Sequence, residues 1–160
     1  MSDFKMPYRE QNSNKGTFGK VLNFSGSKNY IGAAYLSTVS SLKVGAGFSA
    51  LASTKDVIKS VSILLPEAVY LTRDEGLDKI SDFTNILIGC GLGIDSSAQR
   101  IFEKVLKRLE KENINLVIDA DGLNLLAKKH YKLPKNTILT PHPFEASRLL
   151  NCSLEEIWKI

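Results

Sequence analysis

Two aspartates separated by a single alanine are the residues of this sequence best suited to chemistry. Asp119 and Asp121 follow an aliphatic run at 116–118, and Asn124 comes three residues after the second aspartate. Paired carboxylates at the end of a strand can hold Mg²⁺ through water or accept hydrogen bonds from sugar hydroxyls. A structural alternative, in which Asp121 caps a helix and Gly122 forms the turn, explains one carboxylate but not the other. The pair therefore predicts a site for a polar ligand.

A histidine stands between two prolines further along the chain. Pro141 precedes His142 and Pro143 follows it. Proline fixes its own φ and restricts the residue before it, so the backbone has little freedom at this histidine. A lone histidine usually has a structural role, but this rigidity favours an imidazole that holds a ligand. Glu145 is placed either to cap the following helix or to orient a partner.

Two glycine-containing segments match phosphate-binding loops only in part. Residues 89–93 read Gly-Cys-Gly-Leu-Gly, but the third glycine of the dinucleotide fingerprint would fall at Ile94. Residues 26–32 have five residues between their glycines and no Lys-Ser or Lys-Thr after them, which excludes a Walker loop. For 89–93, close backbone approach to a ligand and a merely tight turn both remain open.

Short aliphatic runs alternate with helix-like stretches, which predicts an α/β fold with a parallel sheet covered by helices on both faces. The expected strands are 21–24, 48–52, 68–71, 86–88, 116–118 and 137–139, and the clearest helices are 32–44 and 97–112. In open sheets of this kind, ligands bind beyond the carboxyl ends of the strands. Small or polar residues follow five of the expected strands, so we expect one site along one edge of the sheet.

Length and composition indicate one domain over residues 1–160. The net charge is +4, but the lysines lie on expected solvent faces without interleaved aromatic residues, so we expect no nucleic-acid partner. No stretch approaches the roughly eighteen apolar residues of a membrane span, and the polar start lacks a signal-peptide core, so no membrane partner is expected. We therefore expect a cytoplasmic protein with Cys90 and Cys152 reduced.

The last residues of the sequence predict an interrupted element. Ser153 and Glu156 form a capping box that starts a helix, yet only four residues follow Glu156. So short a helix is marginal at a free end. We expect a domain that is incomplete at its C-terminus, with an exposed sheet edge and an uncovered apolar face. Such surfaces promote association, so a homo-oligomer is expected.

Several further segments accompany those above. Each is short, but together and in this order they are specific. The positions of the whole set are Pro7, Arg9, 15–19, 26–27, 30–34, 45–47, 65–67, 89–93, 119–123 and 139–145. In this order they resemble the ADP/ATP-dependent NAD(P)H-hydrate dehydratases, repair enzymes related to carbohydrate kinases. The resemblance implies a ribokinase-like three-layer sandwich with a mostly parallel central sheet. It also implies that ADP or ATP, with Mg²⁺, phosphorylates the hydroxyl of hydrated NADH or NADPH, and that loss of phosphate restores the coenzyme.

The resemblance assigns site residues by position. Those expected to bind the hydrated coenzyme are Ala34, Gly91, Asp121, Asn124 and His142, and Asp119 is expected to lie nearer the nucleotide cofactor and metal. No catalytic residue is assigned within this chain. The family's Gly-Thr-Gly-Asp turn, which supplies an anion hole and an aspartate base, has no counterpart here, and neither has the Lys-Gly strand end that follows the histidine segment.

Three positions depart from the family pattern without removing a reacting group. Asn14 replaces a histidine, Cys90 a proline and Phe144 a glycine. Two other readings remain open. One is a non-catalytic dinucleotide-binding module, or one half of a split enzyme completed by another chain. The other is a small-molecule kinase of the ribokinase-like group, which the segments at 119–122 and 140–143 disfavour. The sequence does not distinguish ADP from ATP as the phosphoryl donor.

Overall fold

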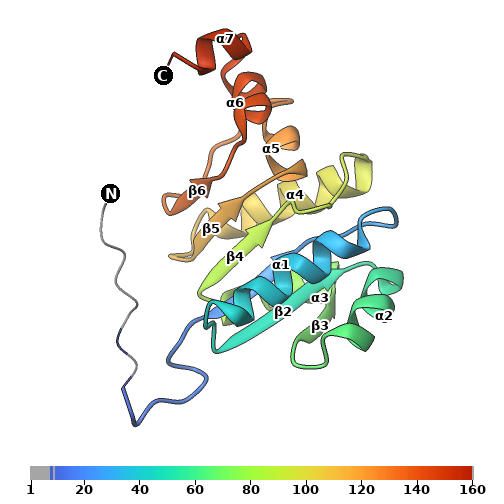
Figure 1. Cartoon of the computed structure of the whole chain (residues 1–160), viewed down its shortest axis with the longest axis vertical. Coiled ribbons are helices and arrows are strands. Elements are labelled where there is room, and N and C mark those ends of the chain that lie inside the picture. Colours follow the sequence, from blue (N-terminus) through green and yellow to red (C-terminus); the bar gives the residue numbers. More distant parts are fainter. Residues whose placement is uncertain (1–7, 9, 160) are drawn as a thin grey trace.

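Six strands form one sheet in which every pairing is parallel (Figure 1). The strands are β1 (Lys20–Phe24), β2 (Phe48–Ser53), β3 (Val69–Thr72), β4 (Asn85–Ile88), β5 (Asn115–Ile118) and β6 (Thr137–Leu139). Their order across the sheet is β3-β2-β1-β4-β5-β6. This computed structural model describes residue 8 and residues 10–159. Pro7 and Arg9, two positions of the family resemblance, lie outside the described residues.

Helices flank both faces of the sheet, as the alternating sequence pattern predicts. They are α1 (Ile31–Lys43), α2 (Lys55–Leu64), α3 (Arg73–Asp78), the short 3₁₀ helix η1 (Ile80–Asp82), α4 (Ser96–Leu109), α5 (Asp121–Leu126), α6 (Pro143–Leu150) and α7 (Leu154–Ile157). On one face, α1 and α2 bury Leu51, Val57 and Val61 in a small core. The larger core, with α3, η1 and α4, lies on the other face.

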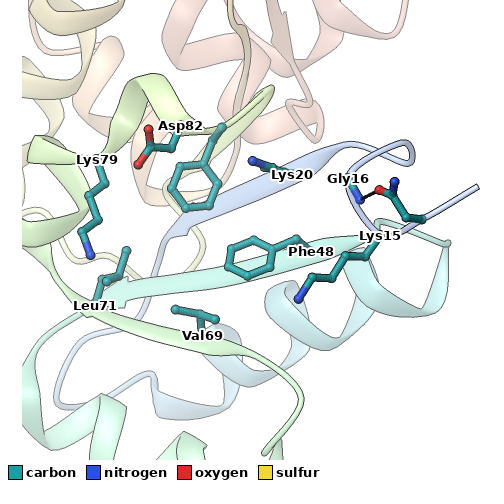
Figure 2. Close-up of a pocket in the computed structure, with 10 residues that line it drawn as sticks. Lys15, Gly16, Lys20, Phe48, Val69, Leu71, Lys79 and Asp82 are labelled. Carbon is teal, nitrogen blue, oxygen red and sulfur yellow. Dashed lines mark hydrogen bonds between the residues drawn. The ribbon is translucent and has the colours of Figure 1, made fainter.

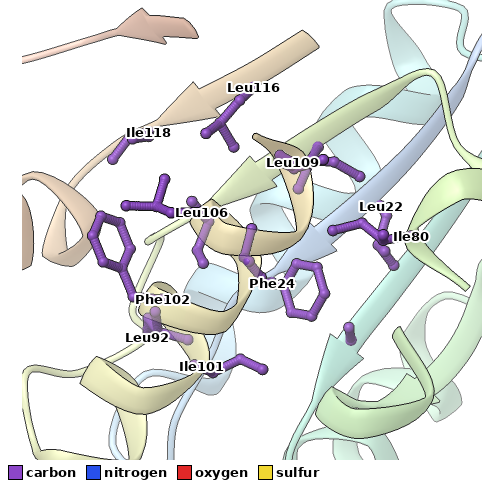
Figure 3. Close-up of a cluster of buried hydrophobic side chains, with 14 of the residues drawn as sticks. Leu22, Phe24, Ile80, Leu92, Ile101, Phe102, Leu106, Leu109, Leu116 and Ile118 are labelled. Carbon is purple, nitrogen blue, oxygen red and sulfur yellow. The ribbon is translucent and has the colours of Figure 1, made fainter. Parts of the chain in front are cut away.

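The larger core packs α4 against β1, β4 and β5 (Figure 3). α4 begins after Asp95, whose carboxylate accepts a hydrogen bond from Ala98 N at 2.8 Å. The buried residues of α4 recur at helical spacing and meet inward-facing strand residues such as Leu22 and Ile118. Burying one such large aliphatic side chain stabilises the fold by roughly 1.5–3 kcal/mol. This helix therefore fixes the strands that lead into the candidate site.

α4 is shorter than the sequence predicts, whereas the last helix begins where the sequence predicts. α4 ends at Leu109 rather than near residue 112, because Glu112 N donates to Leu109 O at 3.1 Å and this tighter turn redirects the chain toward β5. The expected helix start at Ser153 is confirmed, since Ser153 N and Oγ both donate to Glu156 Oε2, at 2.8 and 2.9 Å.

The α1 face of the sheet is only partly covered. The strand register places Leu51, Asn23, Leu87, Val117 and Ile138 in one row across this face. Leu51 and Asn23 are fully buried, Leu87 and Val117 are half-buried, and Ile138 on the edge strand is 59% exposed. A hollow of about 500 Å³ lies over Leu87 and Val117. This is the uncovered apolar face that the sequence predicts.

Among the described residues, no helix combines the length and the apolar character that crossing a membrane requires.

Candidate functional site

Five small or polar segments meet at the carboxyl edge of the sheet. They lie at the carboxyl ends of β1, β2, β4, β5 and β6, at 25–27, 53–54, 89–93, 119–121 and 140–142. The register pairs Phe24 with Ile88, Ile88 with Ile118, and Ile118 with Leu139, so the strands end side by side. The segments that we expected to share one edge of the sheet therefore do so, and their binding of a ligand remains a prediction.

The loops after β1 and β4 are locked together through their backbones. Gly26 N donates to Cys90 O at 2.9 Å. Gly26 has φ +80°, and a Cβ there would lie 2.7 Å from the Ala34 Cβ. Gly89 has φ +128°, and a Cβ there would lie 1.9 Å from Asp119 O. At both positions the positive φ and the lack of space for a Cβ require glycine. The segment at 89–93 is therefore a tight turn that brings its backbone close to its neighbours.

Arg73 is a member of the site that the sequence reasoning missed. Its Nη2 donates to Gly26 O at 3.0 Å and to Leu92 O at 3.4 Å, so one guanidinium joins the two glycine loops. Within the described chain its buried Nε has no hydrogen-bond partner, and burial lowers the pKa of the group. The available signal was its place directly after β3, at the same edge as the other segments.

The turn after β5 is strained between its two aspartates. α5 begins at Asp121 with Ala120 at the N-cap position, so the alternative in which Asp121 is the N-cap is wrong. Ala120 has φ 48°, which is unusual for a residue with a Cβ and costs roughly 1–3 kcal/mol. Asp121 Oδ2 accepts a hydrogen bond from Gly93 N at 2.9 Å. One carboxylate therefore holds the glycine loop while retaining a second oxygen.

Asp119 lies against the cysteine of the glycine loop. Cys90 Sγ is 3.6 Å from Asp119 Oδ2. Burial first, and then the negative charge of Asp119, raise the pKa of the Cys90 thiol to about 12. The thiol is therefore mostly protonated at neutral pH, which argues against a nucleophilic role and agrees with a structural one.

His142 is both the N-cap of α6 and an exposed imidazole. Its backbone N donates to Glu145 Oε2 at 3.0 Å, and its Nε2 lies 3.2 Å from Glu145 Oε1. Glu145 is nearly buried, whereas the histidine side chain is 57% exposed. Glu145 thus caps the helix and orients the ring, which combines the two roles expected of it. Pro143 has a structural reason of its own, because proline suits the first position of a helix.

The other expected contact residues differ in how accessible they are. Gly91 is partly exposed, and a Cβ there would lie 2.6 Å from the Tyr30 Cβ. Asn124 Oδ1 accepts a hydrogen bond from Arg148 Nη1 at 2.7 Å, so its amide nitrogen is the group left for a ligand. Ala34 is fully buried in the small core, so neither its side chain nor its backbone is exposed in this structure. Their contacts with a ligand remain predictions.

The oxygen donors at this edge suit a cation that has few protein ligands. In the part of the chain that the structure describes, no three His, Cys, Asp or Glu side chains converge as metal ligands. Asp119 and Asp121 offer hard oxygen donors on either side of one residue. Mg²⁺ commonly takes one or two carboxylates and completes its shell with phosphates and water. The two aspartates therefore fit a cation carried by a nucleotide rather than a closed protein cage.

Comparisons with known proteins give consistent matches. A family model described as NAD(P)H-hydrate dehydratase matches residues 21–158. The ADP-dependent (S)-NAD(P)H-hydrate dehydratase of Streptococcus thermophilus is 39% identical over 153 residues, which cover 92% of this chain and 55% of that protein.

Solved structures give the same result. A ribokinase-like superfamily protein from Enterococcus faecalis matches with a TM-score of 0.88 and 29% identity, covering 94% of this chain and 54% of that one. The ADP/ATP-dependent NAD(P)H-hydrate dehydratase of Bacillus subtilis, co-crystallized with ATP/Mg²⁺, matches with a TM-score of 0.78 and 32% identity, covering 96% and 55%. The expected ribokinase-like α/β fold is confirmed, and the chain spans about half the length of these proteins.

Proposed function

Since this chain belongs to the NAD(P)H-hydrate dehydratase family, we propose that it forms the hydrated-coenzyme part of a repair site at the carboxyl edge of its sheet. The observation that carries the proposal is the locking of the two glycine loops beside the strained turn at Ala120. This arrangement puts a glycine-rich backbone and two carboxylates on one edge. Such groups suit a ligand that has phosphates, sugar hydroxyls and a modified ring.

Each group has a separate part in the proposed complex. The exposed imidazole of His142, oriented by Glu145, and the backbone at Gly91 contact the hydrated coenzyme. Asn124 contributes its amide nitrogen. Asp119 lies nearer the phosphoryl donor, and Asp121 holds the glycine loop in place while lining the same edge.

The proposed reaction is ADP- or ATP-dependent dehydration of hydrated NADH or NADPH. The ring hydroxyl gives its proton to a base while its oxygen attacks the terminal phosphorus of the donor, and the shortened nucleotide leaves with the electrons of the broken phosphorus–oxygen bond. Phosphate then leaves the ring together with a ring proton, and the double bond returns. A bound Mg²⁺ supplies positive charge to the donor phosphates. The residues of this chain bind and orient the coenzyme, and the sequence contains no Gly-Thr-Gly-Asp turn to supply a base.

A second candidate is one half of a split enzyme, or a binding module without activity of its own. The open α1 face of the sheet, on which another polypeptide can pack, favours it. The coenzyme site is the same in this candidate and in the single-chain enzyme. For both we propose that the protein acts in the cytoplasm. The versions differ in whether another polypeptide supplies the base.

Recovery of NADH absorbance tests the proposal. The purified chain is mixed with hydrated NADH, Mg²⁺ and either ADP or ATP, alone and together with the remaining C-terminal part of the Streptococcus thermophilus relative. We expect no recovery from the chain alone, because it has no residue assigned as the base. Nucleotide-dependent recovery by the chain alone would show that this assignment of roles is wrong. Recovery only in the mixture would support the split version.

A further inference from the structure

A second pocket lies at the opposite edge of the sheet from the coenzyme site (Figure 2). It has a volume of about 520 Å³, which is in the range of small-molecule sites. Lys20 and Phe48, the first residues of β1 and β2, line it. A strand rises about 3.3 Å per residue, so the length of β1 separates Lys20 and Phe48 from Gly26 by on the order of 15 Å. Leu71 is level with Phe24 in the register and is therefore the lining residue nearest to the coenzyme site. The pocket is therefore a separate site.

The pocket exists because α3 is short. This helix covers the carboxyl half of β2, where a Cβ on Gly76 would lie 2.7 Å from the Ala52 Cβ. The amino halves of β2 and β3 extend beyond it. The turn at 14–16 closes the pocket from another side, and a Cβ on Gly47 would lie 1.8 Å from Lys15 O. Close backbone packing thus shapes the pocket. The Asn14-Lys15-Gly16 segment, which the coenzyme site does not use, forms part of its wall.

The floor of the pocket is apolar and partly aromatic. The Phe48 ring lies in the middle of it in Figure 2, with Val69 and Leu71 beside it. Phe83 completes the floor, and its ring centroid is 6.0 Å from that of Phe48 at an interplanar angle of 43°. Phe83 and Leu71 are nearly buried, while Val69 is 37% exposed. Aromatic side chains in this arrangement offer a surface on which a planar ring can lie.

The rim of the pocket carries an excess of positive charge. Lys15, Lys20 and Lys79 stand around it, and Asp82 is the only acid in its lining. In the described chain, the ammonium groups of these lysines make no hydrogen bond or salt bridge, whereas Lys104 and Lys129 pair with Asp74 and Glu103. An ammonium group is a strong point-charge partner for phosphate. The rim is therefore available to an anion.

We propose that this pocket binds a phosphate monoester of a planar aromatic or heteroaromatic compound. The ring lies on Phe48 and Leu71, and the phosphate meets Lys20 and Lys79. A phosphate carries about −1.5 to −2 charges at neutral pH, which matches the net excess of three lysines over one aspartate at the rim. The site is independent of the coenzyme site in both location and chemistry.

Titration of the full chain with phenyl phosphate tests this site. Calorimetry measures the affinity. Inorganic phosphate tests the contribution of the charged group alone, and phenol tests that of the ring alone. We expect phenyl phosphate to bind at least about tenfold more tightly than either probe, since only it uses both parts of the pocket. Amide shifts in NMR spectra are expected at Gly16, Lys20, Phe48 and 79–83. Equal binding of phosphate and phenyl phosphate, no binding, or shifts confined to 26–27 and 89–93 would overturn the proposal.

Exposed lysines provide variants that keep the fold. Lys20→Gln combined with Lys79→Gln is expected to weaken phenyl phosphate binding about tenfold through loss of two charge-assisted contacts. Lys59→Gln, at an exposed position of α2 outside the pocket, is the matched control and leaves the affinity unchanged. Hydrated-coenzyme binding is expected to be the same in all three proteins. An unchanged phenyl phosphate affinity in the double variant would contradict a site at this rim.

Discussion

The geometry of the proposed coenzyme site depends most on the carboxylate of Asp121. This carboxylate accepts a hydrogen bond from Gly93 N at 2.9 Å, and the two residues are 28 positions apart in the sequence. Ala120, immediately before it, holds a φ of 48° that residues with a Cβ rarely adopt. A strained backbone persists only where its surroundings fix it. The contact between Asp121 and the glycine loop is such a constraint, and it links the ends of β4 and β5.

We expect Asp121→Ala to destabilise the fold by roughly 1.5–3 kcal/mol, the usual contribution of a hydrogen bond to a charged group. Urea unfolding, followed by circular dichroism, measures the change. Asp78→Ala, at the exposed end of α3, is the control and should change the free energy of unfolding by less than about 0.5 kcal/mol. Equal effects of the two substitutions would show that the Gly93 contact contributes nothing special.

Cys90 is expected to be poorly reactive toward alkylating reagents. Burial and the neighbouring Asp119 raise its pKa to about 12, and only the thiolate attacks such reagents. Mass spectrometry after timed iodoacetamide treatment at neutral pH measures the labelling of each cysteine. In the folded chain Cys90 should label much more slowly than in urea. A rate that is the same in both conditions would contradict the protected environment described for this thiol.

At the scale of elements, α4 is tied to the segment that follows α5. Glu103 on α4 accepts hydrogen bonds from Lys129 Nζ at 2.6 Å and Tyr131 OH at 3.1 Å. The hydrogen bond from Lys129 contributes most to lowering the Glu103 pKa from 4.5 to about 2. Tyr131 also packs edge-on against Phe102, with ring centroids 5.5 Å apart. This cluster positions the chain that leads into β6.

A carboxyl whose pKa is lower in the folded chain stabilises the fold above its unfolded pKa and loses that effect as the pH falls. We therefore expect the melting temperature of the unsubstituted chain to exceed that of Glu103→Gln near neutral pH. The difference should shrink as the pH falls from 4.5 to about 2. Differential scanning calorimetry over this range measures both proteins. A difference that does not change with pH would indicate that the charge of Glu103 is not what matters.

The strands were predictable from the sequence, whereas several contacts between elements were not. All six strands occur within one residue of the aliphatic runs that predict them, because a parallel sheet with helices on its faces buries most of its strand residues. α3 has a capping box at Thr72 and Glu75 that the sequence contains, although it was not among the expected helices. The Arg73 clamp and the hydrogen bond from Gly93 to Asp121 depend on segments that meet only in the folded chain. No local pattern encodes such pairs.

At the scale of the whole molecule, one face of the sheet is covered less completely than the other. α1 and α2 cover only part of one sheet face, and the edge strand β6 carries Ile138 at 59% exposure. Half-buried Leu87 and Val117 continue this apolar surface toward the centre of the sheet. Exposed apolar edges of this kind promote association. The expectation of a homo-oligomer formed by this chain follows from this face.

Ile138→Lys is expected to shift the chain toward monomers, because a charge on an edge strand opposes pairing with another copy. Light scattering coupled to size-exclusion chromatography measures the mass over a range of concentrations. Ile94→Lys, at an exposed position in the loop before α4, is the matched control and should leave the mass distribution unchanged. A chain without either substitution that is monomeric at all concentrations would contradict the homo-oligomer.

Direct binding of hydrated NADH tests the central claim that this chain forms the hydrated-coenzyme part of a repair site. Calorimetry compares the unsubstituted chain with His142→Ala and with His130→Ala, the other histidine of the sequence, which is exposed and outside the site. We expect saturable binding to the unsubstituted chain and to His130→Ala, and about tenfold weaker binding to His142→Ala, a loss of about 1.4 kcal/mol. Absence of binding by a folded chain, or equal affinities for all three proteins, would contradict the proposed site.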